Sequence, residues 1–172
     1  MKNFLITLGC FIVMLLIATS HSQKKNSTYV GQLAPHFVLQ DDSDSVSLSD
    51  YRGQHLLLSF WSSANAASRI NNKLYDNIIT ENTHKPISML SINYDRSQSL
   101  FREIFKRDFL TPGNHIYDKE GRYSAIFNNY NLKKGYKSVL IDSLGRVVAI
   151  NPGTERLKEI LDALPDKHTH NV

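Results

Sequence analysis

The sequence predicts an α/β domain built on a mixed β-sheet, with helices on both faces and a β-hairpin extension at its N-terminal end. Two continuous apolar runs, residues 55–61 and 87–94, have the composition of strands covered on both faces. A segment with helical periodicity follows each run, which is typical of α/β domains. Two further strand candidates joined by a turn lie after residue 137, so the predicted sheet contains antiparallel as well as parallel strands.

The N-terminal hairpin is predicted from two short strand candidates, residues 36–39 and 45–48. The polar segment 41–44 between them has the composition of a turn. The run HLLLSFW at residues 55–61 then predicts a central strand, because it contains almost no polar residue that could face water.

The next three elements are a helix, a second central strand and another helix. Residues 66–79 place Ile70, Leu74 and Ile78 on one helical face. Residues 87–94, introduced by a proline, predict the second strand. Residues 97–109 predict an amphipathic helix with a stripe of five apolar side chains, namely Leu100, Phe101, Ile104, Phe105 and Phe109.

The last third of the domain predicts shorter elements. A short strand is expected at 115–118 and a small helix at 123–127. Residues 138–142 and 146–150 predict a hairpin, because a Ser-Leu-Gly turn separates them. The final helix is expected at about 154–164.

The first 22 residues have the layout of a secretory signal peptide. Lys2 precedes an almost unbroken apolar run at 4–18, and small residues at 18–20 and 20–22 suit a signal peptidase. The run is shorter than the roughly 20 apolar residues that a spanning helix needs. We therefore expect an exported protein of the periplasm or cell envelope, with an uncleaved N-terminal membrane anchor as the alternative.

Cys10 is the only cysteine of the chain. Its Leu8-Gly9-Cys10 context resembles a lipid-attachment box, but Thr7 replaces the usual leucine and the apolar run continues past the cysteine. We expect Cys10 to be removed with the signal peptide. The mature protein would then contain no thiol and no disulfide.

The rest of the chain predicts one domain, residues 30–165, between a flexible lead-in at 23–29 and a flexible tail at 166–172. The formal charge of +4 comes from 20 basic and 16 acidic residues that are scattered along the chain, so no nucleic-acid partner is expected. Short basic pairs such as Lys133-Lys134 are interpreted as solvated surface. Two histidines in the tail are too few for a metal site, and no metal or other cofactor is expected.

The framework resembles that of the TlpA/ResA-type thioredoxin-like proteins of the bacterial cell envelope, in the AhpC/TSA-redoxin superfamily. Residues 30–69 carry most of this resemblance: VGQLAPHFVLQDDSDSVSLSDYRGQHLLLSFWSSANAASR. The family pattern is G-x-x-A-P-x-F, then S-L-x-D-x-x-G-K, then a strand ending in F-W-A-S-W-C-x-P-C-R. The segments SMLSINYD at 88–95 and SVLIDSLGRVVAI at 138–150 are similar to its second core strand and late hairpin. The resemblance covers residues 30–164 and implies a thioredoxin-like fold.

The chain keeps the scaffold of the family's active loop and lacks its cysteine pair. Four residues match the pattern: Phe60, Trp61, Ser63 and Arg69. Four positions depart from it: Ala64 replaces the second tryptophan, Asn65 the nucleophilic cysteine, Ala67 the proline and Ser68 the resolving cysteine. The family's cis-proline before the late strand corresponds to Tyr136, or to Lys137 one residue later.

Thiol–disulfide exchange needs a thiolate nucleophile, a sulfur leaving group and a resolving thiol, none of which this loop supplies. Asn65 is interpreted as a helix N-cap that accepts a hydrogen bond from the amide of Ser68. The alternative is that the exposed amides of this helix end bind a carboxylate or an extended peptide. A serine nucleophile at Ser68 would need His36, His84 or His115 beside it, and the sequence does not indicate that geometry.

These observations predict a redox-inactive thioredoxin-like protein that binds an unidentified peptide or protein partner. Six residues are expected at the binding surface: Trp61, Ser63, Ala64, Asn65, Ser68 and Tyr136. For Trp61, packing at the edge of the core is favoured over a role as a binding platform. Asp95 is interpreted as a helix cap or a surface residue because no thiol is present for it to assist. The alternatives are an enzyme of other chemistry at the same loop, a thiol–disulfide oxidoreductase by family resemblance only, and a silent subunit of a redox complex.

Overall fold

The computed structural model describes residues 28–40 and 45–167. The predicted signal peptide, Cys10, most of the lead-in and most of the tail lie outside these residues. The elements in chain order are β1 (Val38–Gln40), β2 (Ser45–Ser47), η1 (Leu48–Tyr51), β3 (His55–Trp61), α2 (Ala66–Glu81), β4 (Ile87–Asn93), α3 (Gln98–Arg107), β5 (His115–Tyr117), η2 (Gly121–Tyr123), α4 (Ala125–Asn129), η3 (Leu132–Lys134), β6 (Ser138–Ile141), β7 (Val147–Ile150) and α5 (Gly153–Ala163). Within the described ranges, no helix has the length and apolarity needed to cross a membrane.

The central sheet has five strands in the order β5-β4-β3-β6-β7. Strands β3, β4 and β5 run parallel, whereas β6 is antiparallel to β3, and β7 is antiparallel to β6. The mixed sheet is therefore confirmed. The apolar run of β3 lies in the middle of the sheet, where six of its seven residues are buried.

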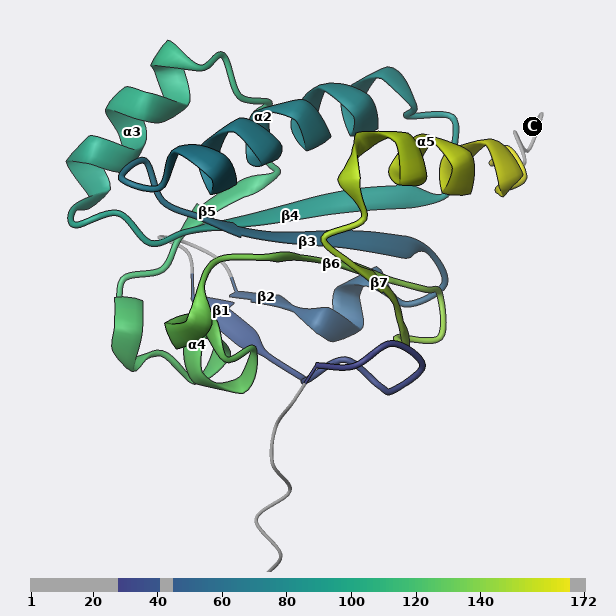
Figure 1. Ribbon diagram of the computed structural model, residues 1–172, viewed down its shortest axis with the longest axis horizontal. Coiled ribbons are helices and arrows are strands. Elements are labelled where there is room, and N and C mark those ends of the chain that lie inside the picture. The colour runs from purple at the N-terminus through teal and green to yellow at the C-terminus, as the bar shows by residue number, and fades with distance from the viewer. Residues whose placement is uncertain (1–27, 41–44, 168–172) are drawn as a thin grey trace, which may run out of the picture.

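The predicted N-terminal hairpin is also confirmed. Strands β1 and β2 form a separate antiparallel pair in which Leu39 lies opposite Val46. Figure 1 shows this pair and α4 on one side of the central sheet, and α2, α3 and α5 on the other. The sheet is thus covered on both faces, as a thioredoxin-like fold requires.

Each face of the sheet has its own apolar core, because successive residues of a strand point to opposite faces. On the hairpin side, Leu56, Leu58 and Phe60 of β3 pack with residues of β1 and α4. On the other side, Leu57 packs with residues of α2 and α5. The two active-loop neighbours Phe60 and Trp61 therefore lie on opposite faces.

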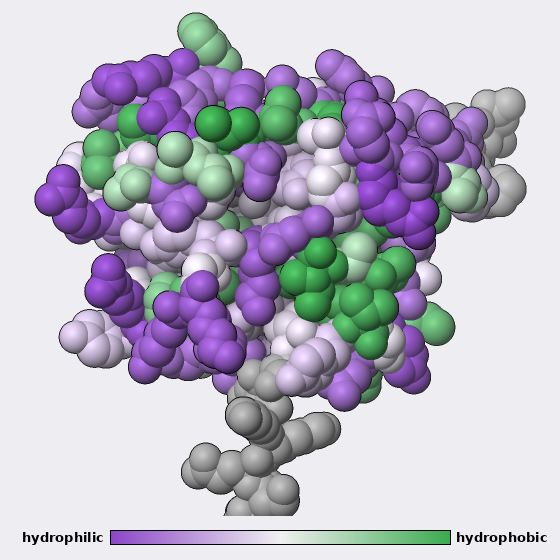
Figure 2. All heavy atoms as spheres, in the orientation of Figure 1, coloured by the Kyte–Doolittle hydropathy of each residue, from purple (hydrophilic) through white to green (hydrophobic). Residues whose placement is uncertain are grey.

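The apolar face that the sequence predicts for α2 is only partly correct. Ile78 is buried, but Ile70 is 59% exposed and Leu74 is 42% exposed. Polar Asn72 and Asp76 are buried instead. The helix is rotated so that these two polar side chains face the sheet, and apolar side chains remain visible on the surface over α2 and over β7 (Figure 2).

The stripe predicted for α3 is wrong at its last position. Phe101 and Ile104 are buried and join Trp61 in a small core. The helix ends at Arg107, and Phe109 follows it with φ of 52° and 85% of its surface exposed. A left-handed residue turns the chain out of the helix, so the helical spacing no longer applies at Phe109.

Candidate functional site

The loop that joins β3 to α2 contains Asn65 at the N-cap position of the helix. Asn65 has an extended backbone, and its side-chain oxygen accepts a hydrogen bond of 2.9 Å from the Ser68 amide. This confirms the predicted cap, which satisfies one of the unpaired amides of the first helical turn.

The hydroxyl of Ser68 is held by the backbone of the same loop. It donates to the backbone oxygen of Asn65 at 3.0 Å and accepts from the amide of Ser62 at 3.3 Å. Neither partner is a base that could remove its proton, so this arrangement does not activate Ser68 as a nucleophile.

Asp95 is buried and holds the loop in place through hydrogen bonds, so its interpretation as a helix cap or surface residue is wrong. It follows β4, is 7% exposed, and leaves the capping of α3 to Ser97. Its Oδ1 atom accepts from the Ser62 hydroxyl at 2.8 Å and from the amide and hydroxyl of Ser63 at 2.7 and 2.8 Å. Its Oδ2 atom accepts from the side-chain amide of Asn93 at 3.1 Å. The sequence signal for this role is an acidic residue directly after a buried strand.

Tyr136 lies across from the loop and lines two cavities together with Asn65. Within the described residues no peptide bond is cis, so Tyr136 does not reproduce the backbone of a cis-proline. Its ring stacks on that of Tyr94, with centroids 6.0 Å apart and planes inclined by 15°. Burial raises the pKa of the Tyr136 phenol above its ordinary value.

Two cavities lie between the loop and the segment before β6. One has a volume of about 420 Å³ and the other about 320 Å³, and Asn65, Gly135 and Tyr136 line both. Ser68 lines the second cavity. The structure therefore brings Asn65, Ser68 and Tyr136 together at one site. We call the two adjoining cavities the loop groove.

The remaining predicted surface residues differ in their access to a ligand. Ala64 is exposed in the loop. Ser63 is half-buried and donates hydrogen bonds to Asp95. Trp61 has no exposed surface and packs against Phe101, so it is a core residue and not part of the binding surface. Its side chain points to the face of the sheet opposite that of Phe60, because successive residues of a strand point to opposite faces.

The three histidines considered as partners for Ser68 all contact other residues. His36 Nε2 lies 3.3 Å from the Ser49 hydroxyl, and His84 Nε2 lies 3.9 Å from an Asp166 carboxylate oxygen. His115 contacts Asp76. Within the described ranges, no three His, Cys, Asp or Glu side chains gather as metal ligands would.

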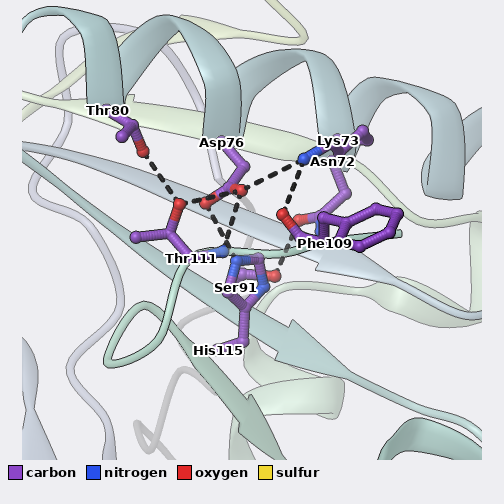
Figure 3. A network of polar contacts seen from close by, with 8 residues as sticks. All are labelled: Asn72, Lys73, Asp76, Thr80, Ser91, Phe109, Thr111 and His115. Carbon is purple, nitrogen blue, oxygen red and sulfur yellow. Dashed lines mark hydrogen bonds and ion pairs between the residues drawn. The ribbon is translucent and has the colours of Figure 1, made fainter. Parts of the chain in front are cut away.

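His115 belongs to a second polar cluster, buried between α2 and the sheet (Figure 3). The His115 Nε2 atom lies 3.1 Å from Asp76 Oδ1, and the two side chains are 0% and 1% exposed. Asp76 Oδ2 accepts from the amide and hydroxyl of Thr111 at 3.0 and 3.1 Å. Burial raises the pKa of Asp76, but the hydrogen bonds and charge of its partners outweigh burial and hold that pKa below its ordinary value.

Comparisons with known proteins support the fold described above. The model of the AhpC/TSA family matches residues 30–150. A crystal structure of a thioredoxin-like protein from Parabacteroides distasonis ATCC 8503 is 31% identical, with a TM-score of 0.67, over 79% of this chain and 98% of that chain. No curated protein matches the chain in sequence.

Two other solved structures share the fold at lower identity. A thiol-disulfide oxidoreductase from Bacteroides fragilis NCTC 9343 is 24% identical, with a TM-score of 0.67, over 77% of this chain and 98% of that chain. A thiol:disulfide interchange protein from Bacteroides sp. is 19% identical, with a TM-score of 0.69, over 84% of this chain and 96% of that chain.

Proposed function

The chain belongs to the AhpC/TSA family, and from this membership together with the composition of its loop we propose that it is a redox-inactive, thioredoxin-like protein that binds a peptide segment of a partner protein. The observation that carries the proposal is the pair Asn65 and Ser68, which occupy the two positions where the resemblance places cysteines. An amide and a hydroxyl cannot form or resolve a mixed disulfide.

The geometry of the loop supports binding without chemistry. Asn65 and Ser68 bond to each other and to neighbouring backbone atoms, and Asp95 fixes the two preceding serines. The loop is therefore a rigid wall of the groove, with Ala67 exposed on it. A rigid, partly apolar groove loses little conformational entropy when it binds an extended peptide.

The proposed place of action is the bacterial cell envelope. The support is the N-terminal sequence, in which a lysine, an apolar run and small residues follow the order of a signal peptide. Mass spectrometry of the protein from cells that express the complete chain tests this point. A mature N-terminus near residue 23 is expected, and retention of Cys10 would contradict it.

An insulin-reduction assay tests redox inactivity. The purified protein with dithiothreitol should precipitate insulin no faster than dithiothreitol alone. A rate clearly above that background would contradict the proposal, because it would require a thiol at the active loop.

A peptide-binding assay tests the groove itself. Ala67 is exposed in the first turn of α2 and lines the groove, so Ala67→Phe should fill the groove without disturbing the core. We expect a loss of about ten-fold or more in affinity for peptides selected on the wild-type protein. Ala163→Phe makes the same change at an exposed position at the end of α5 and should leave affinity unchanged. Equal effects of the two changes would place the peptide elsewhere.

A further inference from the structure

All the charged residues that line the loop groove are basic. Arg122 and Lys133 line the larger cavity, and Lys137 lines the smaller one. No Asp or Glu among the described residues lines either cavity. Arg122 lies in η2, Lys133 in η3 and Lys137 directly before β6, and the fold brings them around Gly135 and Tyr136.

These basic side chains have no acidic partner in the part of the chain that the structure describes. Elsewhere in the molecule, basic residues do pair: Arg69 binds Asp108 at 2.6 Å, and Lys85 binds Asp166 at 2.9 Å. Arg122 and Lys133 instead are exposed without an ion pair among the described residues. A carboxylate that entered the groove would therefore not have to displace an existing partner.

Two further features favour negative charge at the same place. Burial and the nearby charge of Lys134 lower the pKa of Lys137, so an anion beside Lys137 would relieve an unfavourable environment. The sixteen-residue helix α2 also begins at the groove, and the N-terminal end of a helix carries a partial positive charge. Asp95, which holds the loop in place, is buried and accepts four hydrogen bonds from protein donors.

On the basis of the proposed function, we propose that the loop groove binds an acidic, extended peptide segment in which carboxylates alternate with apolar side chains. The basic residues occupy both cavities, so several carboxylates spaced along a chain match them better than one compact anion. Between these charges, Phe127, Leu132 and Tyr136 supply apolar contacts in the larger cavity. Charge complementarity of this kind selects partners more strongly than it raises affinity.

The test uses three synthetic peptides that share their apolar positions and carry Asp, Gln or Lys at the alternate positions. Fluorescence polarisation with the full-length protein at low salt should rank affinities as Asp above Gln above Lys, and physiological salt should reduce the difference. Arg122→Glu and Lys133→Glu should each weaken the Asp peptide about five-fold and leave the Gln peptide unchanged. Lys106→Glu on α3 makes the same change of net charge away from the groove and should have no effect.

The outcomes separate this inference from the function on which it rests. If the Gln peptide binds as tightly as the Asp peptide and Ala67→Phe abolishes both, peptide binding stands and the acidic preference is overturned. If no peptide binds, the proposed function fails and the preference fails with it. If Lys106→Glu weakens the Asp peptide as much as Arg122→Glu, or if free glutamate competes as well as the peptide, a specific acidic-peptide groove is excluded.

Discussion

Asp95 and Ser63 are joined by two hydrogen bonds to one carboxylate oxygen, from the Ser63 amide at 2.7 Å and from its hydroxyl at 2.8 Å. Asp95 follows β4, the strand beside β3, and β3 leads into the loop, so these bonds connect the loop to the end of β4. The Ser62 hydroxyl adds a third bond to the same oxygen. The loop therefore takes its shape from a buried acid, with no contribution from a disulfide.

Removing this acid should destabilise the protein. In Asp95→Ala, the buried hydroxyl of Ser62 and the amide of Ser63 lose their acceptor, and the free energy of unfolding should fall by about 2–4 kcal/mol. Urea denaturation measures the change. Asp95→Asn keeps one acceptor oxygen and should lose clearly less, whereas an equal loss in both variants would show that the negative charge alone matters.

The N-cap makes a smaller and local contribution. Asn65→Ala removes the bond to the Ser68 amide and should lower the free energy of unfolding by about 1 kcal/mol. Asn65→Asp keeps an acceptor at this position and should retain the stability, since a carboxylate caps a helix as well as an amide does. Hydrogen exchange in the first turn of α2 would show whether the effect is confined there.

Two cysteines placed in the loop should give the protein some thiol–disulfide exchange activity. Residues 65 and 68 already lie within one helical turn, since the Ser68 hydroxyl reaches the Asn65 backbone oxygen at 3.0 Å. The double variant Asn65→Cys, Ser68→Cys should form an internal disulfide and give insulin reduction above the dithiothreitol background. Thiol titration and the turbidity assay measure the two properties, and each single variant serves as a control. A disulfide without turnover would show that Ala67 and Tyr136 have altered the site as well.

The sequence allows the local features of the site to be predicted. The strand before the loop is recognisable because its apolar run is unbroken, and the Asn65 cap depends on a partner only three residues away. The late hairpin is recognisable from its short turn. These elements are set by neighbours in the chain, so their pattern is visible without the fold.

The parts that could not be predicted depend on residues far apart in sequence. Asp95 bonds to residues 32 and 33 positions away, so its sequence position alone suggests only a strand end. The buried face of α2 contains Asp76, whose partners His115 and Thr111 lie on later segments. Likewise, Lys133 looks like one of many scattered charges until the fold places it in the same cavity as Arg122.

The Asp76–His115 pair should make stability depend on pH in the acid range. Asp76→Asn should lower the free energy of unfolding by about 2–3 kcal/mol at neutral pH, because a buried acceptor of bonds from His115 and Thr111 loses its charge. Lys73, at 3.8 Å from the same carboxylate, would lose an ion pair as well. Urea denaturation of both proteins over a series of pH values measures this difference.

The direction of the pH dependence follows from the lowered pKa of Asp76. The folded state holds this carboxyl proton more weakly than the unfolded state does, since the bonds to His115 and Thr111 favour the charged form despite burial. The stabilisation is therefore fully present above the ordinary carboxyl pKa of about 4 and is lost as the pH falls through the lower folded-state pKa. The difference in the free energy of unfolding between wild type and Asp76→Asn should therefore decrease below about pH 4. If the difference in the free energy of unfolding between the two proteins stays constant down to the acid transition, the charge of Asp76 is not what stabilises the fold. Its size and its hydrogen bonds would then account for the stabilisation.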